Sequence, residues 1–300
     1  MKKLVIALLC LVILSSVNKP DSRIAAAAAG IAPITTASKQ HQKPTQVAAN
    51  SRVYKNNEAE IDYSNIADGY VKVRYFKQTS NALRVLITAP NDIVYIYQLS
   101  HNMEFDSFPL SEGNGIYTVS VYRQPEKQSG SNLYSHILSV SVDVQLVNEY
   151  APFLLPNQIV NFNKESLFLK KVEEFKKLHD NRAAIDEINR FIVKNMKYDD
   201  KKVLIDDGGY IPCLDRVYTE LTGMCFDYAA LMVAMARSLG IPAKLVIGNT
   251  REECHAWVEV YLEPSGWERR DPTVEVLCRI KRNTQQLIND DNNYIRMFQY

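Results

Sequence analysis

The sequence has few cysteines and no excess of charge of either sign. Its 300 residues include 5 cysteines, which is too few for a disulfide scaffold. The formal net charge is +1, and no basic patch or basic amphipathic helix stands out, so we expect no nucleic-acid partner. No apolar run is long enough for a transmembrane helix, so we expect no membrane span. The remaining composition, 46% hydrophobic and 23% charged, is typical of an ordinary globular protein with room for two modest domains.

Metal-binding motifs are also missing. The sequence contains no C-x-x-C pair, no H-x-x-x-H pair and no EF-hand pattern, so we expect no metal and no cofactor. Cys225, Cys254, His255 and Asp271 could each ligate zinc, but neighbours on one strand, such as Cys254 and His255, point to opposite faces. Three acidic pairs could be imagined as calcium sites, but solvated loop residues are the better interpretation. The pairs are Asp199-Asp200, Asp206-Asp207 and Asp290-Asp291.

The N-terminal segment resembles a secretory signal peptide. Lys2 and Lys3 precede a short apolar run over residues 4–14, and the alanine tract over residues 25–29 offers small side chains for cleavage. Cys10 follows the bulky Leu9, which argues against a lipid-attachment site. We therefore expect a signal peptide over residues 1–29 and a secreted, extracellular chain. Residues 30–60 are poor in large apolar side chains, which predicts a disordered linker.

Residues 61–150 carry the pattern of a small all-β sandwich. The stretches GYVKVRYF, ALRVLITA, DIVYIYQL, GIYTVSVYR and HILSVSVDVQL alternate between apolar and polar side chains. Turn-forming residues such as Asn91-Asp92 and Gly130-Ser131-Asn132 separate them at the spacing of a sandwich. We therefore expect one β-domain that ends near residue 150.

Residues 151–300 switch to a helical period and then return to strands. Apolar residues recur at helical spacing over residues 164–178, 183–196 and 224–239. The stretches AKLVIGN, HAWVEVYL and WERRD follow as strands. Helices followed by an antiparallel sheet predict an α+β domain, and no internal repeat is apparent.

Three residues in these elements could carry nucleophilic chemistry. Cys225 is expected in the first turn of a helix, where backbone amides and the helix dipole favour a thiolate. His255 opens a strand, and Asp271 ends the next strand after a short hairpin, so the carboxylate could orient the imidazole. Taken singly, each residue fits an ordinary structural role better. Together, the three residues could converge in space without strain.

The same residues lie in motifs that resemble the core of the transglutaminase-like superfamily. The stretches are GMCFDYAALMVAMARSLGIPAKLVIGN, HAWVEVYL and WERRDPT, and the resemblance covers roughly residues 198–273. It implies a papain-like α+β fold with Cys225 as nucleophile, His255 as base and Asp271 as the residue that orients the base. The stretches GYVKVRYF and PFLLPNQIVNFN are similar to those that precede this domain in secreted clostridial-type homologues, which implies a bacterial origin.

Further candidates around the triad are open to two interpretations. Trp257 and Tyr261 share the strand face of His255 and could line an acyl-binding cleft or belong to the core. Tyr198 and Tyr210 precede the nucleophile and are candidate substrate or oxyanion residues, because aromatic residues supply such a donor in some relatives. Asp227 fits a carboxylate at a helix start better than a catalytic residue.

These features predict a cysteine-dependent enzyme that acts through a thioester. We expect a protein or peptide substrate with glutamine as the acyl donor and an amine or water as the acceptor. Transamidation is favoured over hydrolysis. The alternatives are a cysteine peptidase or amidase and, in another class, a non-catalytic module that binds a cell wall or a protein. The intact triad argues against that last alternative.

Overall fold

The computed structural model describes residues 35–36, 52–125, 133–199, 201, 210–250, 254–281 and 294–300. The expected signal peptide and most of the expected linker lie outside these residues, as do the acidic pairs at 206–207 and 290–291. Within the described ranges, no helix is both long enough and apolar enough to cross a membrane.

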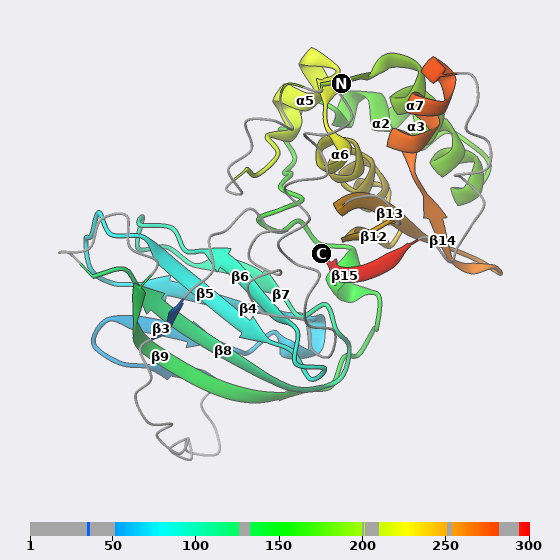
Figure 1. The fold of residues 1–300 in the computed structure, drawn as a ribbon. Coiled ribbons are helices and arrows are strands. Elements are labelled where there is room, and N and C mark those ends of the chain that lie inside the picture. The colour runs from blue at the N-terminus through cyan, green and yellow to red at the C-terminus, as the bar shows by residue number, and fades with distance from the viewer. Residues whose placement is uncertain are drawn as a thin grey trace.

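The first part of the chain forms two sheets (Figure 1). One has the strand order β2-β3-β4-β7, and all of its pairs are antiparallel. The other has the order β1-β9-β8-β5-β6, in which only β1 is parallel to its neighbour. The strands are β1 (Thr35–Thr36), β2 (Val53–Lys55), β3 (Ala59–Asp62), β4 (Tyr70–Tyr75), β5 (Leu83–Thr88), β6 (Val94–Gln98), β7 (Asp106–Pro109), β8 (Gly115–Arg123) and β9 (Leu133–Val144). A short 3₁₀ helix, η2 (Ile66–Asp68), lies between β3 and β4, and a second one, η3 (Ala151–Phe153), follows β9.

The apolar side chains of the alternating sequence pattern form the core of this β-sandwich. In β4 every second residue is buried, so that Val71 and Val73 face inward, while Val85 and Ile87 do the same in β5. Because successive side chains of a strand point to opposite faces, the apolar half of each pattern lies between the sheets. The chain is therefore an α+β protein whose antiparallel sheets precede a helical core.

Residues 53–60, expected in the linker, form strand β2 and part of β3 instead. Ala59 and Ile61 are fully buried although polar residues surround them in the sequence. Glu58 binds Arg123 of β8 in the other sheet, and Glu60 binds Arg74 on the neighbouring strand β4, so both acidic side chains are paired within the fold. Composition alone could not show this, because the pairing partners lie far away in the sequence.

The second part combines helices with a four-stranded antiparallel sheet of order β14-β13-β12-β15. The long helix α6 packs on β12 and β13, and nearly all of its residues are buried (Figure 1). The helices are α2 (Leu169–Phe175), α3 (Asn181–Asn195), α5 (Leu214–Glu220), α6 (Cys225–Ser238) and α7 (Pro272–Lys281). The strands are β10 (Lys197–Tyr198), β11 (Thr222–Gly223), β12 (Ala243–Asn249), β13 (Cys254–Leu262), β14 (Gly266–Arg270) and β15 (Ile295–Gln299).

The helix expected over residues 164–178 is shorter in the structure, where α2 covers Leu169–Phe175. The reason is local hydrogen bonding. The Asn163 side chain accepts the Glu165 N–H, and the Ser166 hydroxyl accepts the Asn163 N–H. Such side-chain bonds compete with helical backbone bonds, so the helix begins after them.

Strand β15 joins the sheet of the second part to the β-sandwich. The Gln299 side chain donates to the Ser111 carbonyl at 2.6 Å, and the Gln299 N–H donates to the Tyr95 hydroxyl at 3.3 Å. The rings of Phe298 and Tyr300 meet the Tyr95 ring edge to face, with centroids 5.7 and 5.4 Å away. The two parts therefore share a buried aromatic and hydrogen-bonded contact.

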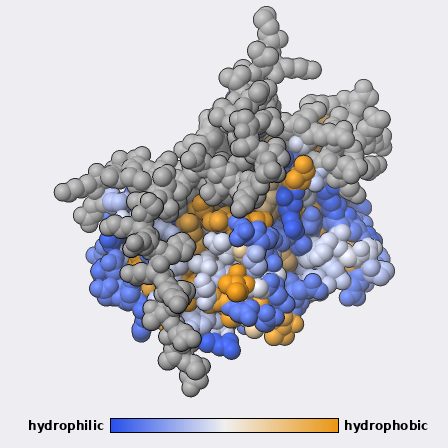
Figure 2. Space-filling model, turned by 60° about the horizontal axis from the view of Figure 1, so that its bottom comes forward, coloured by the Kyte–Doolittle hydropathy of each residue, from blue (hydrophilic) through white to orange (hydrophobic). Residues whose placement is uncertain are grey.

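The surface is largely polar where the structure describes it. On the face shown in Figure 2, hydrophobic residues form separate areas between hydrophilic ones. Large apolar side chains with substantial exposure are scattered along the described chain, at Met103, Phe105, Ile116, Val147, Leu155, Leu167, Leu178 and Ile295. Most of the large apolar side chains are therefore inside.

Candidate active site

The candidate nucleophile, Cys225, is the first residue of α6 and is partly buried. Met224 precedes it as the N-cap, in extended conformation. Amide groups in the first turn of a helix have no partner within the helix and carry the positive end of its dipole. The backbone around Cys225 thus favours a negative charge on an oxygen bound next to the sulfur.

Asp227 holds this helix start in place. Its Oδ2 accepts the Met224 N–H at 2.9 Å, and its side chain is fully buried. Gly223 makes the arrangement possible, because a Cβ at that position would lie 2.6 Å from the Asp227 side chain. Asp227 therefore acts as a helix-capping carboxylate, which is the role its position indicated.

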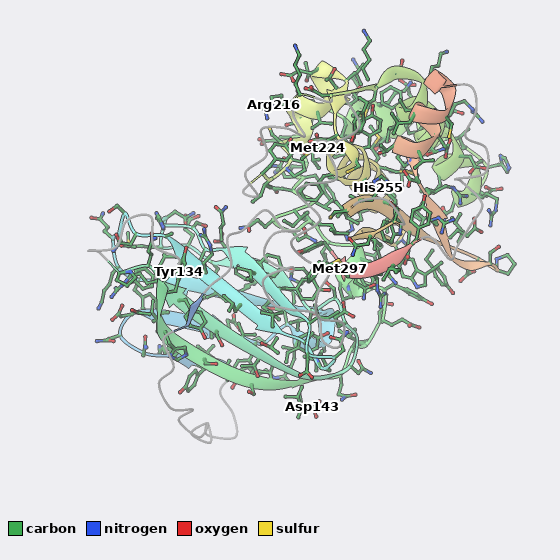
Figure 3. All side chains as sticks on the ribbon, viewed as in Figure 1. Tyr134, Asp143, Arg216, Met224, His255 and Met297 are labelled. Atoms are coloured by element: carbon green, nitrogen blue, oxygen red, sulfur yellow. The ribbon has the colours of Figure 1, made fainter. Side chains whose placement is uncertain are left out.

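His255 and Asp271 form a buried pair beside this helix start. The His255 Nε2 lies 2.7 Å from the Asp271 Oδ2, and the two residues are 7% and 6% exposed. His255 comes from β13, whereas Asp271 follows β14, the strand hydrogen-bonded to β13. Figure 3 shows His255 in the same region as Met224, the neighbour of Cys225. The structure thus brings the three expected residues together from three elements.

The charges around the imidazole favour its protonated form. Burial by itself would lower the pKa of His255, but hydrogen bonds and charges of Asp271 and Cys225 raise that pKa well above its usual value of 6.5. The arrangement suits a thiolate next to an imidazolium, with the carboxylate behind the ring.

Asp271 is itself held by the element that follows it. Its Oδ1 accepts the Val274 N–H at 3.0 Å, and its carbonyl accepts the Glu275 N–H at 3.2 Å, so Asp271 caps α7. A carboxylate used as a helix cap has little freedom to rotate. The sequence pointed to Asp271 as the end of a strand, although aspartate directly before proline is also a typical helix start.

Trp257 lies beside the pair, whereas Tyr261 does not. The Trp257 ring is 2% exposed and stacks near His255 with centroids 6.4 Å apart. Tyr261 instead packs on Tyr150 and Trp267, at 4.3 and 5.5 Å between ring centroids. Trp257 is therefore a packing residue next to the imidazole, and Tyr261 belongs to a separate aromatic group.

The two tyrosines expected near the nucleophile are placed around the start of α6. Tyr198 is paired with Gly223 between the parallel strands β10 and β11, and its ring lies 6.4 Å from that of Tyr228. The Tyr210 hydroxyl donates to Asp227 Oδ1, and burial followed by this bond raises the pKa of Tyr210. Tyr210 thus supports the helix-capping carboxylate.

Sequence reasoning missed Tyr294. Its hydroxyl donates to Asp271 Oδ2 at 2.9 Å, and its ring lies 5.1 Å from the Trp257 ring in an edge-to-face arrangement. Tyr294 stands directly before β15 and outside every motif around the triad, so no spacing in the sequence could have indicated it.

Within the described residues, no group of three or more His, Cys, Asp or Glu side chains is arranged to hold a metal ion. Cys254 and His255 differ in burial, since Cys254 is exposed and His255 is buried. This difference follows from their adjacent positions on one strand.

Comparison with known proteins finds a family model that matches the part of the chain that holds the site. Residues 170–272 match the family model of the transglutaminase-like superfamily. A protein-glutamine gamma-glutamyltransferase of Pseudomonas aeruginosa is 31% identical over 96 residues, covering 27% of this chain and 14% of that protein. The uncharacterized protein YebA of Bacillus subtilis is 26% identical over 143 residues, covering 41% of this chain and 18% of that protein. The chain thus corresponds to a small fraction of the length of either relative.

Solved structures give weaker likenesses. A candidate cysteine protease from Cytophaga hutchinsonii matches with a TM-score of 0.41 and 17% identity, over 84% of this chain and 74% of that chain. The periplasmic domain of TgpA from Pseudomonas aeruginosa matches with a TM-score of 0.36 and 18% identity, over 78% of this chain and 99% of that chain. The segment that matches the transglutaminase-like superfamily model, residues 170–272, contains Cys225, His255 and Asp271.

Proposed function

We propose that this protein is a cysteine-dependent acyltransferase that forms a thioester at Cys225, and that its reaction is protein-glutamine transamidation. The observation that carries the proposal is the buried pair of His255 and Asp271, 2.7 Å apart, next to a cysteine that opens α6. A lone cysteine at a helix start does not imply catalysis. A cysteine paired with an oriented imidazole has the parts that nucleophilic catalysis needs.

The steps follow from the positions of these groups. The Cys225 thiolate attacks the carboxamide carbon of a glutamine side chain, and the carbonyl oxygen becomes an oxyanion near the first amides of α6. The His255 imidazolium gives its proton to the departing nitrogen, so that ammonia leaves and a thioester remains. Neutral His255 then accepts a proton from an incoming amine, which attacks the thioester carbon. The carbon–sulfur bond breaks and the thiolate is restored.

The alternative reaction uses water in place of the amine. The same thioester would then be hydrolysed, which corresponds to an amidase or cysteine peptidase. The triad is compatible with either acceptor, because the choice depends on how well the bound acyl group is shielded from water. Tyr198, Tyr210 and Trp257 are the residues that we propose to test for such shielding and for oxyanion contacts.

The experiment offers a glutamine peptide and a fluorescent primary amine to the protein, with products identified by mass spectrometry. We expect an amine adduct that disappears in Cys225→Ala and persists in Cys213→Ala, since Cys213 is an exposed thiol away from the pair. Deamidation or cleavage without an adduct would establish the hydrolase. No product with any peptide set, together with a Cys225 that resists alkylation, would favour the binding module.

We further propose that the chain is exported, with residues 1–29 removed, and that it acts outside the cell or at the cell wall. The support is the basic start and short apolar run of the sequence. We propose two units for this exported protein: the sandwich, which includes β2 and β3 and ends near residue 150, and the catalytic domain over residues 151–300. N-terminal sequencing of secreted protein tests the cleavage, and a lipid-bearing chain that begins at Cys10 would contradict it.

A further inference from the structure

The carboxylate of Asp271 is bound on both of its oxygens. Oδ1 accepts the Val274 N–H at 3.0 Å, while Oδ2 faces His255 Nε2 at 2.7 Å and accepts the Tyr294 hydroxyl at 2.9 Å. Only the Tyr294 bond comes from a residue outside the strands and helix that carry the pair. That tyrosine therefore limits how the carboxylate can turn relative to the imidazole.

The ring of Tyr294 is also confined. It lies edge to face against Trp257 with centroids 5.1 Å apart, and the Arg269 guanidinium carbon lies 3.9 Å from its centroid. Gly248 gives room for this approach, because a Cβ there would lie 2.6 Å from the Trp257 ring and 2.1 Å from the Ile295 carbonyl oxygen. In the sheet, Gly248 pairs with His255 on one side and with Arg296 on the other.

The other end of the same strand is fixed by the β-sandwich. Gln299 is 5% exposed, its side-chain nitrogen donates to the Ser111 carbonyl, and its side-chain oxygen accepts from Arg296 at 2.7 Å. Tyr95 of the sandwich adds a hydrogen bond to the Gln299 N–H. Five residues of β15 thus connect a buried contact with the sandwich to the tyrosine bound to Asp271.

We propose that Tyr294 is a positioning residue for Asp271, and that the β-sandwich holds Tyr294 in place through β15. The inference rests on the proposed function, because it assigns Asp271 the task of orienting His255. It gives the sandwich a role in the reaction without any contact with substrate. Small displacements of an orienting group can slow a reaction strongly, since the geometry of the reacting atoms decides the rate.

The first test is Tyr294→Phe, which keeps the ring and removes the hydroxyl. Losing one hydrogen bond to a charged group should lower kcat about tenfold, with KM within about twofold of the wild type. The downfield proton resonance of the His255–Asp271 hydrogen bond should shift or broaden in the NMR spectrum. Unchanged kcat together with an unchanged resonance would overturn the proposal.

The second test asks whether the sandwich acts through Tyr294. Gln299→Ala removes the bond to Ser111, and we expect it to lower kcat in the same direction as Tyr294→Phe. When Gln299→Ala is combined with Tyr294→Phe, kcat should fall hardly further than in Tyr294→Phe alone. Both changes act on the position of Asp271 through Tyr294, so their effects should not multiply. If the two single losses in kcat multiplied in the double variant, the sandwich would not act through Tyr294, and the proposal would be contradicted.

The matched control is Gln158→Ala. Gln158 also bonds to the sandwich, accepting the Gln98 N–H at 2.9 Å and donating to the Gln98 carbonyl at 2.8 Å, but it does not lie on β15. We expect kcat of this variant to stay within about twofold of the wild type. An equal loss in the control would show a general effect of the domain contact and would overturn the role of β15.

These readouts separate the inference from the proposed function. If the wild type transfers no acyl group, the His255 resonance and the rate of Cys225 alkylation still show whether Tyr294 positions the pair. If the wild type turns over and Tyr294→Phe behaves identically in every readout, the inference fails and the proposed function stands.

Discussion

At the scale of single residues, the site combines groups whose charges depend on one another. The pKa of His255 is raised because the bonds and charges of Asp271 and Cys225 outweigh the effect of burial. The His255 imidazole therefore stays protonated when the pH rises above 6.5, the usual pKa of histidine. It loses its proton only as the pH passes the raised pKa that His255 has in the folded protein. A thiolate at Cys225 keeps its cationic partner throughout that range.

The first prediction concerns the reactivity of Cys225. Substoichiometric iodoacetamide at about pH 6, where ordinary thiols are protonated, should label Cys225 before Cys213, Cys254 and Cys278. His255→Ala should move this labelling to higher pH, since the thiolate loses the imidazolium. Peptide mapping measures both effects, and faster labelling of Cys213 or Cys254 would refute the prediction.

The second prediction separates the two tasks of Asp271. In Asp271→Asn the side-chain oxygen can still cap α7 by accepting the Val274 N–H, so the melting temperature should change little. The amide N–H₂ would face His255 Nε2 and impose the wrong tautomer, so kcat should fall by about 10³- to 10⁴-fold. Turnover equal to that of the wild type would remove Asp271 from the mechanism.

At the scale of elements, strands β12 and β15 of the four-stranded sheet approach each other closely beside His255. Register places Gly248 of β12 opposite both His255 and Arg296, and β15 carries an irregularity at this point. A residue without a side chain is required there by the contacts with Trp257 and the Ile295 carbonyl.

The third prediction follows from that close approach. Gly248→Ala should destabilise the fold by about 1–3 kcal/mol, because the methyl group forces β15 and the Trp257 ring apart. Activity should fall as well, since Tyr294 precedes β15. Asn249→Ala, at an exposed position on the same strand, is the matched control. Chemical denaturation measures both variants, and equal stabilities would contradict the packing argument.

The expected elements were predicted best where their pattern is local. The strand AKLVIGN is β12, and the helix expected over residues 224–239 is α6, because short-range periodicity marks a buried strand or helix. Strand β15 was missed because its pairing with β12 joins residues far apart in the sequence. Helix α7 was missed because Asp271 was interpreted as the end of a strand and a partner of His255, and the helix-start signal of Asp271-Pro272 was not used.

At the scale of the whole molecule, Arg237 ties three distant segments together. It is 3% exposed, and its guanidinium donates to the carbonyls of Ala243, Leu155 and Tyr300 at 2.9, 2.6 and 2.6 Å. These carbonyls belong to β12, to the segment after the sandwich and to the residue after β15. One buried side chain thus binds three backbone carbonyls, of which that of Tyr300 also accepts the Leu245 N–H at 3.1 Å.

The fourth prediction is that Arg237→Met destabilises the protein by about 2–4 kcal/mol, because buried carbonyls lose a charged donor while the apolar stem is kept. Arg190→Met, at an exposed position of α3, should change stability by at most about 0.5 kcal/mol. Thermal and urea unfolding measure the difference. Similar values for the two variants would show that the three carbonyls find other partners.

The α+β class, the order of cysteine, histidine and aspartate, and the helix and strands near them could be predicted from the amino-acid sequence, because periodicity and motif order are local properties. Tertiary packing brings the Tyr294 hydroxyl to the same oxygen of Asp271 that faces His255, a contact that no motif indicated. It also decided that the sandwich holds β15 through Gln299. Hydrogen bonds between residues far apart in the chain produce no periodic pattern in the sequence. They can be identified only once the packed elements bring the partners together.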